Sequence, residues 1–331
     1  MADKAHNETD EKLAEMEEHL SAIYEEASKD IEAKAQEYFD RFKEQDEKMR
    51  KKVEQGEMTE DEYIAWRRSK MLYGKRYTDL QHSLAEDLRH VNEIAMAYVN
   101  DQLPEIYALN YNALKGAVES VVKGYSFSLV NPQVVKNLAT RDRTLLPYKD
   151  VNGRKDVRWN TQKVNSAVLQ GVLQGESIPN IGKRLRSVTE MNRASSIRNA
   201  RTSVTAAENY ARFDSFLRLQ DEGHEVIKTW TATLDMRTRH EHGMLDGQEK
   251  PLLEPFTVNG YELMLPGDIN GEPEMVYNCR CRLGRKIGFN KPTDRVARVN
   301  INGKEKSVLI PNMTYSEWYE WRKQNGNSIP R

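Results

Sequence analysis

The chain has 331 residues, of which 38% are hydrophobic and 31% are charged, and its mean hydropathy is −0.80. This length is sufficient for two or three domains with a modest core. Because the net charge is only −1, the protein as a whole has no strong electrostatic attraction to one class of partner. The sequence has neither an apolar run long enough for a transmembrane helix nor the apolar segment of a signal peptide. Its two cysteines fit a reducing compartment.

The first 123 residues are expected to form a helical arm or bundle. In residues 11–54, apolar side chains recur at steps of three and four, which predicts either a helix packed within its own domain or a coiled coil. Residues 1–60 carry ten basic and nineteen acidic side chains. This acidic segment is therefore expected to face protein and to bind DNA poorly.

Two local signals divide this helical region. Thr59 and Glu62 form a capping-box pattern, which predicts that a second helical stretch begins at about residue 60 and runs to 102. Pro104 is expected to break it, because proline disfavours helix at the residue before it. A third helix is predicted for residues 105–122.

Between residues 124 and 160 the pattern changes to short pieces separated by turn signals. We expect a linker or a β excursion here, with a turn at Asn152-Gly153. The chain is then predicted to be helical again over residues 161–173, 178–188 and 192–221, and Gly175 is expected to end the first of these helices.

Residues 151–220 contain twelve basic and five acidic side chains. One interpretation is a basic surface that contacts DNA phosphates without sequence specificity, since the interleaved aromatic residues of single-strand binding proteins are nearly absent. The alternative is an arginine-rich helix face that pairs with the acidic N-terminal segment. The candidate phosphate contacts are Lys183, Arg184, Arg186, Arg193, Arg198 and Arg201.

The stretch from Lys228 to Leu283 carries the most specific chemistry. Residues 228–233 alternate in the manner of a half-buried strand, and turns follow it. His-x-His and Cys-x-Cys pairs supply donors that suit tetrahedral zinc, although the spacing is unusual. The alternative is two buried reduced thiols with two histidines that cap turns. The candidate metal ligands are His240, His242, Cys279 and Cys281.

Downstream, residues 282–287 are expected to continue a strand, and residues 296–308 to form a hairpin about Asn302-Gly303. Residues from Thr314 onward predict a short helix whose aromatic face docks on the domain or on a partner. The predicted fold is therefore α+β: an elongated, mainly helical N-terminal region, a compact α+β domain with a small antiparallel sheet over residues 161–290, and a C-terminal hairpin and helix over 291–331.

Residues dispersed along this stretch occur in the same order as the motif residues of a known family. They are Trp230, Asp235, Arg237, Arg239, His242, Asp246, Gly247 and Asn278, together with Cys279 and Cys281. At these positions the chain resembles the head morphogenesis, or minor head, proteins of tailed phages typified by the Mu protein F family. The resemblance covers about residues 160–285 and, more loosely, most of the chain. His240 is an additional histidine that the family pattern does not include.

The resemblance implies a minor capsid protein of a tailed double-stranded DNA phage. Such a protein would associate with the portal and other head proteins, enter the procapsid from the host cytoplasm, and assist assembly, packaging or delivery of DNA. It would lie in the virion near the portal vertex. In this interpretation the motif residues hold loops together, with zinc as the candidate cofactor, and DNA is a candidate non-specific partner.

The alternative function is an enzyme carried in the virion. A metal-dependent nuclease would use His240, His242 and Asp246, and a nucleotide-modifying domain is a further version of this hypothesis. However, the sequence shows neither a recognisable nucleophile–base pair nor a glycine-rich phosphate loop after a strand. We therefore expect a structural protein rather than an enzyme.

Overall fold

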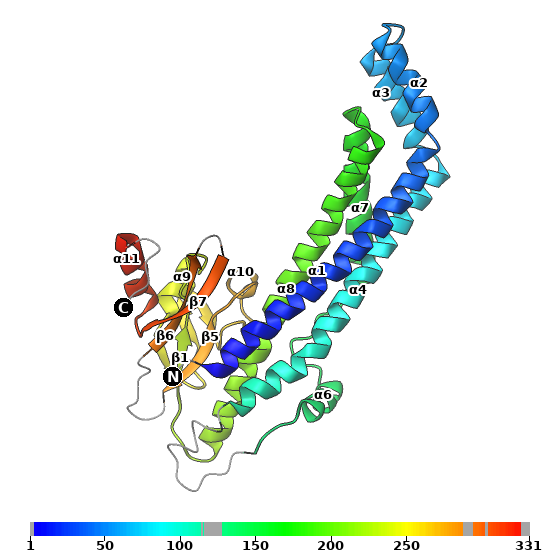
Figure 1. The fold of residues 1–331 in the computed structure, drawn as a ribbon. Coiled ribbons are helices and arrows are strands. Elements are labelled where there is room, and N and C mark those ends of the chain that lie inside the picture. Colours follow the sequence, from blue (N-terminus) through cyan, green and yellow to red (C-terminus); the bar gives the residue numbers. More distant parts are fainter. Residues whose placement is uncertain (1–2, 114, 116–127, 287–293, 302–303, 326–331) are drawn as a thin grey trace. The chain divides into compact units, whose positions relative to one another are not determined.

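A computed structural model describes residues 3–113, 115, 128–286, 294–301 and 304–325. The fold is α+β, as the sequence predicts, with long helices and small antiparallel sheets (Figure 1). The chain forms two compact units, and each unit combines separate stretches of sequence. We call residues 1–15, 100–149 and 198–331 the sheet unit, and residues 16–99 and 150–197 the helical unit.

Long helices contribute residues to both units, namely α1 (Lys4–Asp40), α4 (Lys75–Asn112) and α8 (Ile178–Asp221). The helical unit also contains α2 (Lys43–Glu54), α3 (Glu60–Met71) and α7 (Gly153–Leu173). The sheet unit also contains α6 (Pro132–Arg141), α9 (His240–Leu245), α10 (Pro273–Val276) and α11 (Tyr315–Asn325). The domain boundaries expected near residues 123, 160 and 290 follow changes in the local sequence pattern. The two units are instead defined by contacts between segments that are distant in sequence.

The expectation that Pro104 breaks a helix is wrong. Pro104 lies inside α4, which continues to Asn112. Leu103, Ile106 and Tyr107 are all buried, so packing along this face of the helix holds the backbone in helical conformation through the proline. Tertiary contacts therefore override the local preference of this residue.

Side-chain caps begin α3 and α7. The capping box predicted at Thr59 and Glu62 is confirmed, with the side chain of each residue bonded to the backbone N–H of the other. The β excursion expected at Asn152-Gly153 is wrong, because the Asn152 side chain accepts a hydrogen bond from the Lys155 N–H and begins α7. Asparagine favours both turns and helix N-caps, so the dipeptide alone did not distinguish them.

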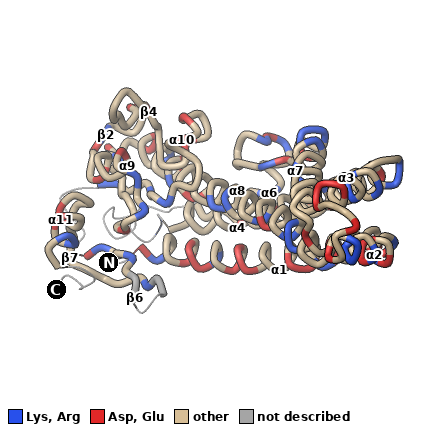
Figure 2. The backbone as a smooth tube through the Cα atoms, turned by 90° about the horizontal axis from the view of Figure 1, so that it is seen from above, with Lys and Arg blue, Asp and Glu red and all other residues tan. Residues whose placement is uncertain are grey.

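The helical unit has a core to which α1, α4, α7 and α8 contribute, and the apolar stripe predicted in the N-terminal segment lies in it. The α1 contribution includes Ile31, Ala35 and Phe39, which pack with residues such as Leu88 and Val168. For the part of α1 in the helical unit, this packing favours an intramolecular helix over a coiled coil. Acidic residues line much of α1 (Figure 2). Among the described helices, none is both long and apolar enough to cross a membrane.

The central sheet of the sheet unit has the antiparallel strand order β2-β1-β5. Its strands are β1 (Ile227–Thr231), β2 (Glu249–Pro251) and β5 (Arg282–Lys286), and a separate hairpin joins β3 (Phe256–Val258) to β4 (Tyr261–Leu263). The alternation predicted for β1 is present. Trp230 pairs with Leu283 on the buried face, while Thr229 and Thr231 are half-buried on the other face.

One buried residue of β1 was not expected from the sequence. Lys228 has no exposed surface, and its ammonium donates a hydrogen bond to the Met264 carbonyl at 2.8 Å. The ammonium nitrogen also lies over the rings of Phe256, at 5.0 Å, and Phe213, at 5.5 Å. Burial lowers the pKa of Lys228 to about 8, because a charged group loses hydration in this environment.

The C-terminal hairpin and helix form as predicted. β6 (Asp294–Ile301) pairs with β7 (Lys304–Pro311), and the predicted turn residues Asn302-Gly303 lie outside the described residues. Trp318 of α11 is buried in a cluster with Leu234, Ala297 and Ile310. The aromatic face of the terminal helix therefore docks on the sheet unit itself.

Candidate functional site

His242, Cys279 and Cys281 form a buried cluster in the sheet unit. His242 lies in α9, and the two cysteines lie between α10 and β5. The His242 Nδ1 atom is 3.3 Å from the Cys281 Sγ atom and 3.7 Å from the Cys279 Sγ atom. One donor atom from each residue lies within 4.8 Å of the other two, so the three side chains are close enough to share a metal ion.

His240 is not part of this cluster. It is exposed at the first position of α9, whereas His242 is buried two residues later. The sequence interpretation assumed an extended His-x-His pair whose side chains share a face. In a helix, residues two apart point in different directions, so only one of the two histidines faces the thiols.

A buried ion pair between Asp246 and Arg295 joins several segments next to the cluster. The Asp246 carboxylate accepts hydrogen bonds from both terminal nitrogens of Arg295, at 2.6 and 2.8 Å. It also accepts hydrogen bonds from the backbone N–H groups of Ala232 and Tyr315, each at 2.7 Å. This single carboxylate therefore connects α9 with the end of β1, with β6 and with the start of α11.

Asp235 makes a second ion pair, with Arg280, the residue between the two cysteines. The Arg280 guanidinium donates to both carboxylate oxygens, and the Arg237 N–H adds a bond at 2.9 Å. Burial alone would raise the pKa of Asp235, but the bonds and charge of Arg280 outweigh it and lower the pKa. The pair ties the loop after β1 to the cysteine loop.

The remaining motif residues also act on these loops. Arg239 donates a hydrogen bond to the Tyr277 carbonyl, and Asn278 has a positive φ of 57° with its N–H bonded to the Thr202 hydroxyl at 2.9 Å. Gly247 has a φ of 78°, as a turn glycine requires. Trp230 packs its ring edge-on against His242. The Arg237 side chain is largely exposed.

Polar residues on one buried face of α8 hold the cysteine loop, and sequence reasoning missed most of them. The Thr205 hydroxyl donates to the Cys279 carbonyl at 2.7 Å. The Asn209 side chain donates to the Cys281 carbonyl at 3.1 Å and accepts the Leu283 N–H at 2.6 Å. The signal that could have revealed this face is the spacing of Thr202, Thr205 and Asn209 along one side of a helix.

The predicted phosphate contacts are distributed between ion pairs and exposed positions. Arg184 pairs with Glu176, and Arg193 pairs with Glu190. Arg186 pairs with Glu32 of α1 at 2.7 Å. This pair agrees with the alternative interpretation, in which the arginines contact the acidic N-terminal segment. Lys183 and Arg198 are exposed and have no ion-pair partner among the described residues, and Arg201 is half-buried.

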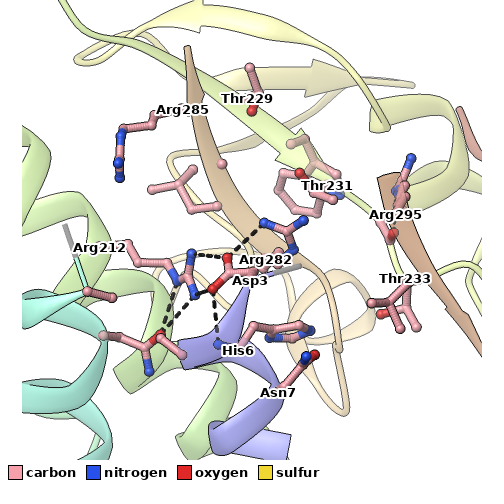
Figure 3. A pocket seen from close by; sticks show the side chains of 18 of the residues that line it. Asp3, His6, Asn7, Arg212, Thr229, Thr231, Thr233, Arg282, Arg285 and Arg295 are labelled. Carbon is pink, nitrogen blue, oxygen red and sulfur yellow. Dashed lines mark hydrogen bonds and ion pairs between the residues drawn. The ribbon is translucent and has the colours of Figure 1, made fainter. Parts of the chain in front are cut away.

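A cavity of about 1190 Å³ lies in the sheet unit, and the N-terminal turn of α1 forms part of its wall. Figure 3 shows Asp3 between the guanidinium groups of Arg212 and Arg282. Arg212 contacts both Asp3 oxygens, at 2.7 and 3.1 Å, and Arg282 contacts one at 2.9 Å. Burial would raise the pKa of Asp3, but these two charges hold it far below its usual range.

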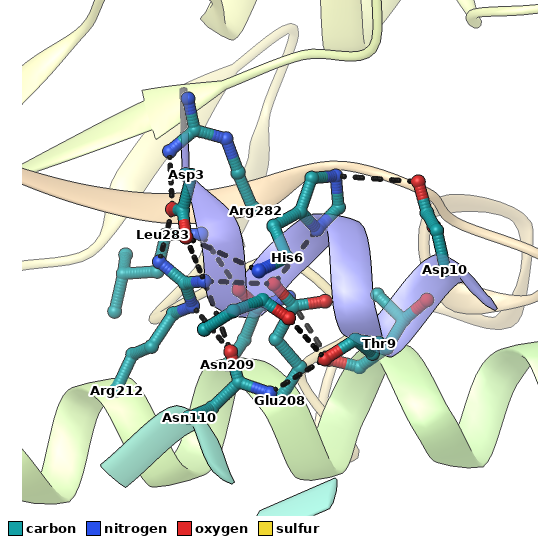
Figure 4. A network of polar contacts seen from close by, with 12 residues as sticks. Asp3, His6, Thr9, Asp10, Asn110, Glu208, Asn209, Arg212, Arg282 and Leu283 are labelled. Atoms are coloured by element: carbon teal, nitrogen blue, oxygen red, sulfur yellow. Dashed lines mark hydrogen bonds and ion pairs between the residues drawn. The ribbon is translucent and has the colours of Figure 1, made fainter. Parts of the chain in front are cut away.

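The same turn makes further polar contacts that sequence reasoning did not predict (Figure 4). The His6 Nδ1 atom lies 2.8 Å from the Glu208 carboxylate. Burial alone would lower the pKa of His6, but the Glu208 charge raises it. Asn110 donates to the Thr9 hydroxyl at 2.8 Å. The contacts of this N-terminal segment, including the bond from Arg298 to Asp10, join residues up to 288 positions apart, which local patterns do not reveal.

The geometry does not bring together a hydrolytic metal centre from His240, His242 and Asp246. The Asp246 carboxylate is bonded to Arg295 and to two backbone N–H groups, and His240 is exposed. Among the described residues, the His, Cys, Asp and Glu side chains close enough to share an ion are His242, Cys279 and Cys281. This set contains two thiols and lacks a carboxylate to serve as a base.

Two comparisons with known proteins show a similarity to phage head proteins. Residues 162–284 match the family model described as Phage Mu protein F like protein. The chain is 23% identical to the Minor head protein GP7 of Bacillus phage SPP1 over 313 residues, which are 94% of each protein. The resemblance to phage minor head proteins is therefore confirmed.

The chain also resembles a larger bacterial protein in part. It is 28% identical to the NAD(+)--arginine ADP-ribosyltransferase EFV of Enterococcus faecalis (strain ATCC 700802 / V583) over 208 residues. The match covers 62% of this chain but spans only 39% of that protein. No solved structure matches the chain.

Proposed function

We propose that this chain, as a relative of phage minor head proteins, is a minor capsid protein that associates with the portal of a tailed double-stranded DNA phage. It would enter the procapsid and assist head assembly, genome packaging or DNA delivery, near the portal vertex. The observation that carries this proposal is the match to the Minor head protein GP7, which extends over 94% of both chains. The match therefore includes the helical region as well as residues 162–284.

The features of both units suit a structural role. In the sheet unit, the motif residues Asp235 and Asp246 are fully engaged in ion pairs and hydrogen bonds that hold loops. In the helical unit, much of α1 presents acidic side chains, which suit contacts with protein rather than DNA (Figure 2). The polar groups of the motif thus hold the loops of the sheet unit in place. A stable fold of this kind suits a protein whose role is to bind other head components.

An enzymatic function has weaker support. The similarity to an ADP-ribosyltransferase covers 39% of that protein, and a partial match of this kind transfers no activity to this chain. The residues of the nuclease hypothesis are separated or already bonded, as described for His240 and Asp246. The minor head protein relationship favours a structural role.

Portal association can be tested by sedimentation of purified components. We expect the full-length chain to co-sediment with portal oligomers of its own phage, because the proposed role requires a direct contact. An unrelated ring-shaped oligomer of similar mass serves as the control. If the chain stays in the supernatant with portal and with control alike, the proposed contact is wrong.

DNA binding is a separate part of the proposal and depends on the exposed basic residues. We expect weak, non-specific binding to a DNA duplex that falls steeply with salt, because phosphate contacts release counterions. Lys183→Gln or Arg198→Gln should weaken it, since both side chains are exposed. Arg186→Gln is the matched control, because Arg186 already pairs with Glu32. Retention in a gel-shift assay that does not change with salt would contradict phosphate binding.

A further inference from the structure

The His242 ring is oriented so that one nitrogen faces both thiols. Its Nε2 atom lies 2.9 Å from the carbonyl oxygen of Met275. A carbonyl oxygen only accepts hydrogen bonds, so Nε2 carries the hydrogen, and in the neutral ring Nδ1 has the free lone pair. That lone pair is directed at the Sγ atoms of Cys279 and Cys281. A backbone carbonyl that fixes the second ring nitrogen is the usual partner of a metal-bound histidine.

The separations within the cluster match the edges of a metal tetrahedron. Zinc binds sulfur at about 2.3 Å and imidazole nitrogen at about 2.0 Å, which places neighbouring nitrogen and sulfur ligands roughly 3.6 Å apart. The two measured Nδ1–Sγ distances, 3.3 and 3.7 Å, lie on either side of this value. An imidazole and a thiol that merely share one hydrogen would not require a second sulfur within 3.7 Å of the same nitrogen.

The surroundings of the Cys279 sulfur also suit a thiolate. The Cys281 N–H points to the Cys279 Sγ atom at 3.4 Å, a donor that stabilises negative charge on sulfur. The carbonyl groups of both cysteines are held by α8, through Thr205 and Asn209. All three candidate ligands are at most 2% exposed. The loop geometry is therefore fixed by bonds that do not involve the sulfurs, as a preformed site requires.

We propose that the His242 Nδ1 atom and the sulfurs of Cys279 and Cys281 bind a zinc ion. Zinc fits these ligands because it is a borderline-soft ion that accepts mixed nitrogen and sulfur donors. Structural zinc is almost always four-coordinate, so the fourth position belongs to water or to a ligand outside this set, and His240 does not supply it. The ion would connect α9 to the loop before β5, beside the Asp235–Arg280 ion pair.

The test is metal analysis of tag-free, full-length protein purified without chelator. We expect about one zinc per chain, and loss of at least about nine tenths of it in His242→Ala, Cys279→Ser and Cys281→Ser, because each variant removes one of three protein ligands. His240→Ala is the matched control and should keep its zinc, since it changes a neighbouring histidine on the same helix. Zinc absent from the parent, or lost equally in both histidine variants, would overturn the proposal.

A second measurement keeps the test valid if a variant fails to fold. Cobalt is added to the folded parent after its zinc has been removed with a chelator, and the absorption spectrum is recorded. Intense sulfur-to-cobalt charge-transfer bands and tetrahedral visible bands are expected, because cobalt takes the place of zinc at thiolate sites. A spectrum of weak octahedral cobalt alone contradicts the site. Neither measurement involves the portal, so its outcome is independent of the proposed function.

Discussion

Asp246→Ala is expected to destabilise the sheet unit by about 3–5 kcal/mol, the usual loss when one partner of a buried ion pair is removed. The variant would leave the Arg295 guanidinium buried beside an empty space, and it would leave the Ala232 and Tyr315 N–H groups without their acceptor. The measurement is the free energy of unfolding by denaturant, followed by tryptophan fluorescence. Trp230 and Trp318 are suitable reporters because both are buried in this unit.

The matched control is Asp221→Ala, which removes an exposed carboxylate at the end of α8. We expect this change to alter stability by no more than about 0.5 kcal/mol, as is usual for surface positions. A loss below about 1 kcal/mol for Asp246→Ala would show that the carboxylate does not hold these segments together. In that case the structural interpretation of the motif would need another basis.

Lys228→Met is expected to stabilise the protein near neutral pH. The pKa of Lys228 is about 8 in the folded protein and 10.5 for the free side chain, so folding makes the charged form less favourable. This difference corresponds to a cost of roughly 3 kcal/mol below about pH 8. Methionine avoids that cost but leaves the Met264 carbonyl without its donor, so the expected net gain is roughly 1–2 kcal/mol.

The sign of the pH dependence distinguishes this explanation from simple repacking. Between about pH 8 and pH 10.5 the unfolded chain binds more protons at this lysine than the folded chain, so the parent gains stability as pH rises. The advantage of Lys228→Met should therefore shrink over this interval. Unfolding curves for both proteins near pH 7 and near pH 10 provide the comparison. An advantage that is the same at both values would exclude titration of Lys228 as its cause.

The spacing of apolar residues correctly predicted several elements whose residues follow a regular helical or strand pattern. The alternating residues of β1, the hairpin of β6 and β7 and the helix α11 all form at the expected places. Two of the errors fall where one signal fits two structures. Asn152 was taken for a turn residue and is a helix cap, and Pro104 lies in a helix that buried neighbours maintain. Only tertiary packing decides between these alternatives.

The candidate site was predictable in its residue types and less so in its pairings. His242, Cys279 and Cys281 were identified from donor chemistry, whereas His240 was included because the segment was assumed to be extended. The partner of Asp246 could not be predicted, because Arg295 lies 49 residues further along the chain. Likewise, no local pattern connects Asp3 with Arg212 and Arg282.

The bonds of the N-terminal turn have a consequence for synthesis of the protein. Asp3 and Asp10 are synthesised before their partners Arg282 and Arg298, which follow them by 279 and 288 residues. The sheet unit can therefore complete its folding only after Arg298 has been made, and contacts between residues so distant in sequence form slowly. A chain that stopped between Arg212 and Arg282 would keep the Asp3–Arg212 pair but would leave Asp3 without its second guanidinium.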